Sequence, residues 1–227
     1  SYLAAISFMD GQLGRVMRAL ETGPNANNTA VVLWSDHGWH LGEKSHWRKF
    51  SLWEESTRSV LMMNIPGVTK PGGRCSRAVN LLGIYPTLCE THGLSKPAAL
   101  EGTSFVAQLR NPSAPRPEPT LTTYLRGNHS LRDVRWRYTR YADKSEELYD
   151  HGNDPQEYTN LAARPDMAKI KEKLAAWFPK TDAPPSPVTA VRTLPRPGTW
   201  PQRTALPLRA ESSMLWHYPH SHPNTGR

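Results

Sequence analysis

Cysteine and long apolar runs are both scarce in this chain of 227 residues. Its two cysteines, Cys75 and Cys89, are too few for a disulfide scaffold, and neither stands in the Cys/His spacing that a zinc site needs. No segment approaches the roughly 20 apolar residues that cross a bilayer. The charged residues of the first 20 positions also do not fit a signal peptide. The sequence predicts a globular chain without a membrane span and leaves its location open.

Acidic residues are the next shortage, since 28 Lys and Arg outnumber 20 Asp and Glu and give a formal net charge of +8. Such a charge suggests an anionic partner, and nucleic acid is the first candidate. Residues 179–227, however, carry half of this excess, and the rest of the chain shows no basic stripe interleaved with aromatic residues. We therefore expect no nucleic-acid partner.

The first half of the chain alternates helical and strand patterns. Apolar residues recur at helical spacing over 2–21, and a Gly-Pro pair then ends the pattern. The apolar, β-branched run over 29–35 is typical of a strand buried on both faces of a parallel sheet. A second such strand is predicted over 60–64, and a short helix closed by a glycine over 83–93. Together these elements predict an α/β architecture.

The pattern changes beyond about residue 118, where apolar and polar residues alternate with period 2. This alternation predicts antiparallel strands over 120–126 and 131–142, separated by a Gly-Asn turn, and residues 147–162 follow as strand, turn and helix start. Four apolar residues then fall on one helical face: Met167, Ile170, Leu174 and Trp177. We expect that helix to pack across a small antiparallel sheet.

These patterns divide the chain into three parts. Residues 1–117 are predicted to be a portion of an α/β core, and residues 118–181 the small sheet with its helix. Residues 182–227 form a proline-rich tail: ten of the 21 prolines lie from position 179 onward, and no periodicity continues there. We expect this tail to be extended or disordered.

Asp36 and His37 directly follow the first predicted strand. Ligands of open α/β sheets bind outside the carboxyl ends of the strands, so the two side chains stand where a site is expected. Asp36 offers an oxygen ligand suited to Ca²⁺ or Mg²⁺, and Gly38 permits tight backbone geometry next to the pair. A hard cation takes about six or more ligands, so other segments must supply most of them. Taken alone, the three residues could equally form a polar turn.

The loop that follows is dense in hydrogen-bond donors. Lys44, His46, Arg48 and Lys49 lie within six positions and would attract an anionic group held near a metal. A sulfate ester is such a group, because its peripheral oxygens need fixed donors and positive charge. The alternative is an ordinary solvated loop.

Five segments of the chain, in order, carry a resemblance to a known family. They are SYLAAISFMDGQLGRVMRALE, SDHGWHLGEKSHWRKFSLWEESTR, IPGV, VNLLGIYPTLCETHGL with LEGTSF, and ELYDHGNDPQEYTNLA. The chain resembles the C-terminal half of the sulfatases, most closely the iduronate-2-sulfatase-like branch, from residue 1 to about residue 181; single pieces such as DHG are weak signals, but five in order are specific.

The resemblance implies an alkaline-phosphatase-like core followed by the small sheet, a bound Ca²⁺ in preference to Mg²⁺, and a formylglycine nucleophile made from a cysteine in a CxPSR motif. By analogy Asp36 and His37 are metal ligands and Lys49 contacts the sulfate. Lys44 and His46 lie in the same loop as candidate substrate-binding residues without a matching family role. The family implies a periplasmic, extracellular or lysosomal-type compartment for a complete member.

The chain departs from the family in catalysis: the family's N-terminal Asp-Asp metal ligands and its catalytic Lys and His have no counterpart here, and the nucleophile is also missing. Neither Cys75 nor Cys89 stands in a CxPSR context. We therefore expect the nucleophile in a missing N-terminal half, and expect this chain alone to be inactive. The complete form is predicted to be a sulfuric-ester hydrolase acting on a sulfated saccharide. A phosphonate or phosphate monoester hydrolase, and a non-catalytic fragment that binds sulfated glycans, remain the alternatives.

Overall fold

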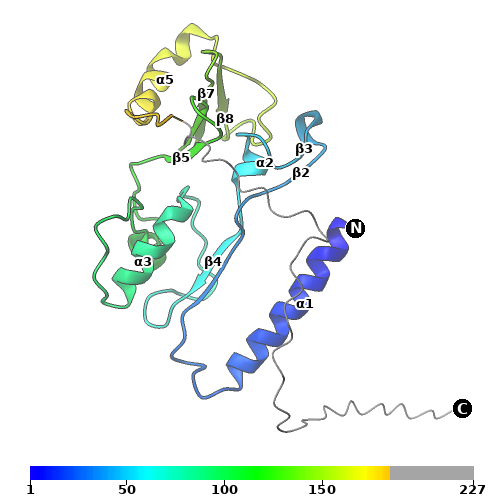
Figure 1. Ribbon diagram of the computed structural model, residues 1–227, viewed down its shortest axis with the longest axis vertical. Helices are drawn as coiled ribbons and strands as arrows, with labels where there is room; N and C mark the ends of the chain where they lie inside the picture. The colour runs from blue at the N-terminus through cyan, green and yellow to red at the C-terminus, as the bar shows by residue number, and fades with distance from the viewer. Residues whose placement is uncertain (185–227) are drawn as a thin grey trace, which may run out of the picture. The chain divides into compact units, whose positions relative to one another are not determined.

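The computed structural model describes residues 1–184 and begins with the predicted N-terminal helix, α1 (Tyr2–Glu21) (Figure 1). Its apolar residues have the expected spacing, yet none of the α1 residues, all of which the structure describes, is buried. Leu3 and Phe8 are 75% and 71% exposed. The helix therefore forms as its sequence dictates, but residues 1–184 do not cover its apolar side.

Strands β1 (Val31–Trp34) and β4 (Leu61–Asn64) form within the two segments that the sequence analysis identified as strands. The expectation of a parallel sheet buried on both faces was wrong for them, because they pair antiparallel as a two-stranded sheet and are only half buried. An unbroken apolar run indicates a strand but does not determine the direction of its neighbour. Trp34 and Met62 are left exposed on this pair.

The segment between β1 and β4 carries the candidate site. It holds a short hairpin of β2 (His40–Leu41) and β3 (Trp47–Arg48), a 3-10 turn η1 (Glu43–Ser45) inside that hairpin, and the one-turn helix α2 (Glu54–Thr57). Gly42 at the hairpin's turn has φ of 127°, a conformation that favours glycine.

Three short helices connect β4 to the C-terminal sheet: η2 (Leu81–Gly83), α3 (Ile84–Thr91) and α4 (Val106–Arg110). As predicted, α3 ends at a glycine in the left-handed region, Gly93. The buried hydroxyl of Thr87 in α3 accepts from the backbone N of Phe105 at 3.0 Å. This bond fixes α3 against the start of α4.

The predicted antiparallel sheet is present as β5 (Thr120–Thr123), β6 (His129–Arg132), β7 (Trp136–Arg140) and β8 (Glu146–Asp150), paired in sequence order. The prediction of one strand over 131–142 was wrong, because the chain turns within it. The carboxylate of Asp133 accepts from the backbone N of Arg135 at 2.8 Å and of Trp136 at 2.6 Å. This local turn reverses the chain between β6 and β7.

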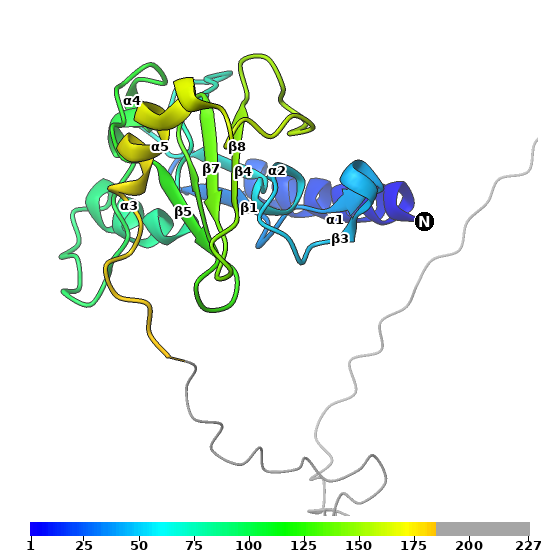
Figure 2. The same ribbon diagram turned by 90° about the horizontal axis from the view of Figure 1, so that it is seen from above.

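Helix α5 (Ala168–Ala175), preceded by η3 (Pro165–Met167), packs against one face of this sheet, as predicted (Figure 2). The core between them is built from Leu131, Tyr138, Leu148, Ala162, Leu174 and Phe178. Trp177 does not share this face, since it lies beyond α5 and is 48% exposed. The small sheet with α5 therefore closes its own core.

The other face of the same sheet is polar and is covered by the candidate site segment. Arg137 alternates with the core residue Tyr138 in β7 and so points to the opposite face. Its guanidinium donates to the carbonyl oxygen of Leu52 at 3.2 Å and to the hydroxyl of Thr57 at 3.0 Å. The loop before α2, and α2 itself, thus pack on the sheet.

The predicted boundaries at residues 117 and 181 stay predictions. Of the proline-rich tail, residues 185–227 lie outside the described residues. Within residues 1–184, no helix has both the length and the apolar character needed to cross a membrane.

Candidate active site

The structure brings three of the predicted site residues together, and we call Asp36, His37 and Lys49 the site cluster. Asp36 and His37 follow β1, and the β2–β3 hairpin returns the chain so that Lys49 reaches them. His37 Nε2 lies 3.4 Å from Asp36 Oδ2 and 2.8 Å from Lys49 Nζ. The Asp36 side chain is 81% exposed and that of His37 is 29% exposed.

The hydrogen bonds of His37 determine which ring nitrogen carries the proton. Nδ1 lies 2.7 Å from the carbonyl oxygen of Gly38, and because a carbonyl can only accept, Nδ1 is the donor. Nε2 therefore has a free lone pair, which accepts a hydrogen bond from the Lys49 ammonium. A backbone carbonyl on the other ring nitrogen is a common way to orient a metal-binding imidazole.

Gly38 holds the first part of the site cluster against α2. Its backbone N donates to the carbonyl oxygen of Ser56 at 2.8 Å. A Cβ at this position would overlap the carbonyl oxygens of Glu55 and Arg58. The close approach that the sequence analysis expected from this glycine is therefore confirmed, and it sets the direction of the neighbouring His37.

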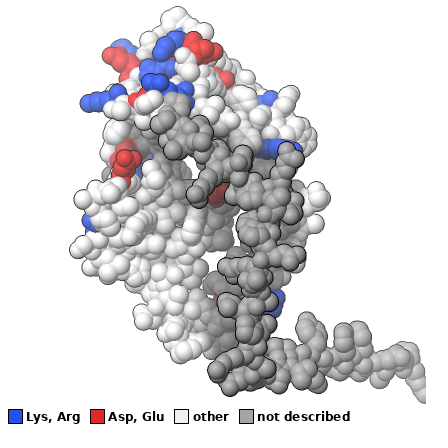
Figure 3. Space-filling view, viewed as in Figure 1, with Lys and Arg blue, Asp and Glu red and all other residues white. Residues whose placement is uncertain are grey.

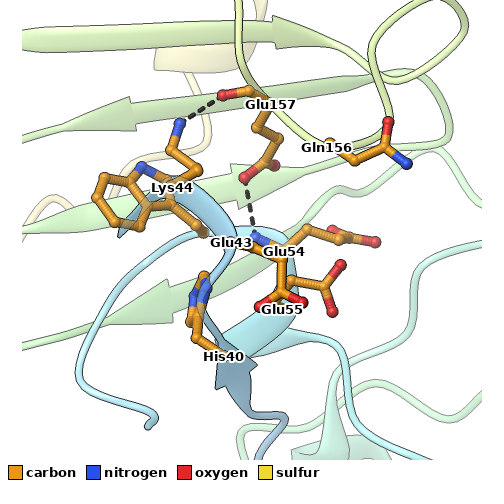
Figure 4. Close-up of a pocket in the computed structure, with 8 residues that line it drawn as sticks. His40, Glu43, Lys44, Glu54, Glu55, Gln156 and Glu157 are labelled. Atoms are coloured by element: carbon orange, nitrogen blue, oxygen red, sulfur yellow. Dashed lines mark hydrogen bonds between the residues drawn. The ribbon is translucent and has the colours of Figure 1, made fainter. Parts of the chain in front are cut away.

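Lys44 points toward the small sheet, where its ammonium reaches the backbone of Glu157 (Figure 4). Its ammonium donates to the Tyr149 hydroxyl at 3.0 Å and to the carbonyl oxygen of Glu157. It also lies 4.5 Å from the centroid of the Trp53 ring and 4.4 Å from that of the Tyr149 ring. Burial lowers the pKa of Lys44, although nearby carboxylates oppose this shift.

His46 also lies apart from the site cluster. Its ring packs edge to face against His40 and Trp53, with centroids 4.9 Å and 5.8 Å away. His40 is fully buried, and its Nε2 lies 3.0 Å from the Ser51 hydroxyl. The pKa of His40 is lowered by burial and by the neighbouring His46. Substrate binding by Lys44 and His46 stays a prediction, and neither contacts the site cluster within residues 1–184.

A group of charged residues that the sequence patterns did not indicate lies where the site segment meets the small sheet. At its centre, Glu157 is 1% exposed. One carboxylate oxygen accepts from Arg137 Nε and from His151 Nε2, the latter at 2.8 Å. The other accepts from the backbone N of Glu54 at 2.9 Å (Figure 4). We call Glu54, Arg132, Arg137, His151 and Glu157 the buried ion network.

Three members of this network, Glu54, His151 and Glu157, have ligand atoms within 4.8 Å of one another, a spacing that could hold a metal ion. Arg137, however, donates to both carboxylates and already supplies the positive charge there. Burial opposes ionisation of both glutamates. At Glu54, the charges of Arg137 and Arg132 outweigh burial and lower the pKa. At Glu157, the hydrogen bond from His151 and the charge of Arg137 do the same. The network is therefore an ion-pair cluster rather than a metal site.

The signal for this network was present in the sequence but ambiguous. Arg137 stands in an alternating strand, where a charged residue usually faces solvent, and Glu157 lies in the segment over 147–162 that predicts strand, turn and helix start. Burial of both residues depends on contacts with Glu54 and Leu52, more than 80 positions earlier. A single sequence does not reveal such contacts.

Comparison with known proteins identifies the family. Residues 42–182 match the family model described as N-sulphoglucosamine sulphohydrolase, C-terminal. A sulfatase of Formosa agariphila is 41% identical over 183 residues, covering 81% of this chain and 36% of its own length. Iduronate 2-sulfatase of Mus musculus is 33% identical over 133 residues, covering 48% of this chain and 24% of its own length. The chain thus spans about a third of the length of the first curated relatives.

Solved structures give the same result. A protein in complex with its substrate D-glucosamine-2-N,6-O-disulfate superposes with a TM-score of 0.70 at 25% identity, over 77% of this chain and 38% of that chain. The phosphonate monoester hydrolase of Agrobacterium radiobacter gives 0.62 at 28% identity, over 75% and 38%. The chain has part of the alkaline-phosphatase-like fold that the sequence predicted. With a family model that covers well over half of its residues, this chain belongs to the sulfatase family and corresponds to the C-terminal region of its members.

Proposed function

We propose that this chain supplies part of the metal and sulfate site of a sulfuric-ester hydrolase that acts on a sulfated saccharide. The observation that carries the proposal is the site cluster, in which a carboxylate, an oriented imidazole and an ammonium meet at the end of β1. The sulfatase relatives support the reaction class. The solved relative bound to a disulfated glucosamine supports the substrate class.

The distances in the site cluster fit one shared cation. Two ligands of Ca²⁺ at right angles, each about 2.3 to 2.6 Å from the ion, lie about 3.3 to 3.7 Å apart. His37 Nε2 and Asp36 Oδ2 are 3.4 Å apart. For Mg²⁺, with bonds of about 2.0 to 2.1 Å, the separation would be near 2.9 Å. This separation supports one cation shared by Asp36 and His37, and we propose Ca²⁺, with the remaining ligands supplied by other segments.

Asp36 and His37 would hold this cation, and a bound cation supplies Lewis-acid polarisation of a sulfate oxygen. The Nε2 lone pair of His37 cannot serve a cation and the Lys49 ammonium at once. Lys49 must then turn to another acceptor, and a sulfate oxygen of the substrate is the acceptor we propose. Its positive charge would stabilise the charge that develops as the S–O bond breaks.

We further propose that the nucleophile, a formylglycine, belongs to an N-terminal half of the same enzyme. The support is that the relatives are about three times as long as the matched part of this chain. That half would also cover the apolar side of α1 and the exposed Trp34 and Met62 of the β1–β4 pair, because exposed apolar surface of this extent marks a contact site.

Within the sulfatases, we propose an iduronate-2-sulfatase-like specificity, on the similarity to that enzyme of Mus musculus. A second candidate is a phosphonate monoester hydrolase, favoured by the structural likeness to the enzyme of Agrobacterium radiobacter. A cation and a lysine can bind a sulfate ester or a phosphonate monoester equally well. A fragment that binds sulfated glycans without hydrolysis is the third.

The test joins this chain to the N-terminal half of its Formosa agariphila relative and compares Asp36→Ala with Lys49→Ala. Asp36→Ala should lose both Ca²⁺ binding, measured by calorimetry, and nearly all turnover. Lys49→Ala should keep Ca²⁺ binding while kcat/KM for a sulfated saccharide falls about 10²-fold or more. Lys171→Ala, which removes a lysine paired with Glu146 on the small sheet, is the matched control and should change neither.

Each alternative has its own outcome in this experiment. Preference for a phosphonate monoester over every sulfate ester would favour the phosphonate hydrolase. Saccharide binding without turnover would favour the glycan-binding fragment. Kinetics of Lys49→Ala equal to those of the Lys171→Ala control would contradict the proposed role of Lys49.

A further inference from the structure

Lys44 and Lys49 lie five positions apart in one loop but have different partners. Lys49 reaches the site cluster, whereas Lys44 crosses to the small sheet and ends between the rings of Trp53 and Tyr149. Two of the three ammonium hydrogens have acceptors there, the Tyr149 hydroxyl and the Glu157 carbonyl oxygen. An ammonium between two aromatic faces is a favourable cation–π arrangement when it is partly desolvated.

Both ends of this contact have backbone conformations that only close packing maintains. Lys44 has φ of 55° and Glu157 has φ of 62°, the left-handed region that non-glycine residues avoid. At Lys44 this conformation turns the loop so that the side chain can reach the sheet. At Glu157 it presents the carbonyl oxygen to Lys44 while the carboxylate stays in the buried ion network.

The anchor on the sheet side is rigid because Glu157 is held at both of its carboxylate oxygens. Arg137 and His151 donate to one oxygen, and the backbone N of Glu54 donates to the other. A charged residue that is fully buried and fully bonded in this way has no alternative position of similar energy. The carbonyl that receives Lys44 is thus a fixed point.

We propose that Lys44 is a positioning residue, which locks the loop that carries Lys49 onto the small sheet through Tyr149 and the backbone of Glu157. The catalytic part of this inference, that the lock places Lys49 for a sulfate, rests on the proposed function. The lock itself does not. Under this proposal, the small sheet sets the geometry of the site through the loop that Lys44 holds.

The lock can be measured without turnover, by hydrogen exchange of backbone amides in the full 227-residue chain. The amides of Gly42, Ser45 and His46 donate to carbonyls within the loop, at 3.0 to 3.1 Å, and report its order. Lys44→Met keeps the length of the side chain but removes its charge and hydrogen bonds. Exchange of these three amides should rise at least about tenfold, because charged hydrogen bonds and a desolvated cation–π contact are lost. The exchange rates of the amides in β6 and β7 should be unchanged.

Three further variants separate positioning from general support. Lys44→Arg should recover most of the protection, because a guanidinium can also stack on the rings and donate to both acceptors. Tyr149→Phe, which removes one acceptor and keeps the ring, should raise loop exchange by a smaller factor of about three, and it keeps the test informative if Lys44→Met does not fold. Lys171→Met, the matched control, should leave the loop unchanged.

Two results would overturn the proposal. One is loop exchange in Lys44→Met within about twofold of the unchanged chain, since such a difference is too small for a lost charged hydrogen bond. The other is an equal loss of protection in the loop and in β6 and β7, which would make Lys44 a general stabilising residue. If kcat/KM is unchanged in Lys49→Ala but loop exchange rises in Lys44→Met, the proposed role of Lys49 is rejected and the lock by Lys44 is retained.

Discussion

The small C-terminal sheet and the N-terminal region that begins with α1 differ in how they are packed. Strands β5 to β8 enclose an apolar core with α5 on one face and bury an ion network against the site segment on the other. In contrast, α1 buries none of its described residues, and the β1–β4 pair is only half buried. Both regions follow their local sequence patterns, but only the first finds its packing partners within residues 1–184.

The distribution of charge follows the same division. On the face shown in Figure 3, Lys, Arg, Asp and Glu gather over the part of the molecule that Figure 1 labels α5, and much of the surface over α3 and β4 carries none. We therefore expect the C-terminal sheet to contribute most of the stability of residues 1–184. The candidate site residues lie on a segment that packs on that sheet.

The largest effect is expected from Arg137→Met. This change leaves Glu54 and Glu157 buried without their shared cation, and breaking one side of a buried ion pair costs about 3 to 5 kcal/mol. Urea unfolding followed by a probe on the small sheet measures the loss. Arg164→Met, which removes an exposed pair with Asp166, is the control and should leave the midpoint unchanged. Equal midpoints for the two variants would contradict a stabilising network.

The second prediction compares one leucine in the small sheet with one apolar residue of the N-terminal region. Leu148 is fully buried, so Leu148→Ala should lower the free energy of unfolding by about 3 kcal/mol. Met62 in β4 is more than half exposed, so Met62→Ala should change it by less than about 0.5 kcal/mol. Comparable losses of unfolding free energy in the two variants would contradict the difference in packing between the two regions.

How much of this could be predicted from the sequence depends on the distance between contacting residues. The helix over 2–21, the strand before Asp36 and the close packing of Gly38 are local consequences of their residues, and all three are confirmed. The direction of the β1–β4 pair and the burial of Arg137 depend on residues far away in the chain. The periodicity of a single segment carries no information about them.

The turn at Asp133 is a different kind of miss, because its cause is local. The side chain of Asp133 accepts from two backbone N atoms just ahead of it, a common turn device, but the alternating residues on both sides concealed it. For Lys44, the sequence indicated an exposed donor in a dense loop. The aromatic rings that hold it come from positions 53 and 149, and only folding brings them together.

The third predicted effect is the loss of stability in acid, which is smaller than the first two and gradual. The pKa values of Glu54 and Glu157 are held below their usual range, and the hydrogen bond from Arg135 lowers that of Asp150 to about 2. Folded pKa values below the unfolded ones mean that the unfolded chain binds more protons as the pH falls. The stabilisation is therefore complete above about pH 5 and is lost progressively toward pH 2.

Urea unfolding at pH 6, 4 and 3 tests this dependence. The unchanged chain should weaken steadily over that range. Arg137→Met, whose network is already broken, should show a shallower decline. Parallel declines in the two chains would show that the network does not cause the acid sensitivity.

The smallest effect on stability is expected from Phe8→Ser in α1. Because this side chain is largely exposed, the free energy of unfolding should change by less than about 0.5 kcal/mol. Self-association should decrease, since an apolar contact surface becomes more polar. Analytical ultracentrifugation measures the association, and Lys169→Ser, an exposed polar change in α5, is its control. Unchanged association would indicate that the apolar side of α1 does not mediate it.

The link between Lys44 and Glu157 also sets an order of events during folding. The two residues are 113 positions apart, so the candidate site loop closes only after a long stretch of chain has emerged. At about 5 to 20 residues per second, translation delivers Glu157 roughly 6 to 23 seconds after Lys44. The loop that leaves the ribosome early can therefore make this contact only after Glu157 has been synthesised. A nascent chain stopped before β8 would carry Asp36, His37 and Lys49 on a segment that lacks the Tyr149 and Glu157 contacts of Lys44.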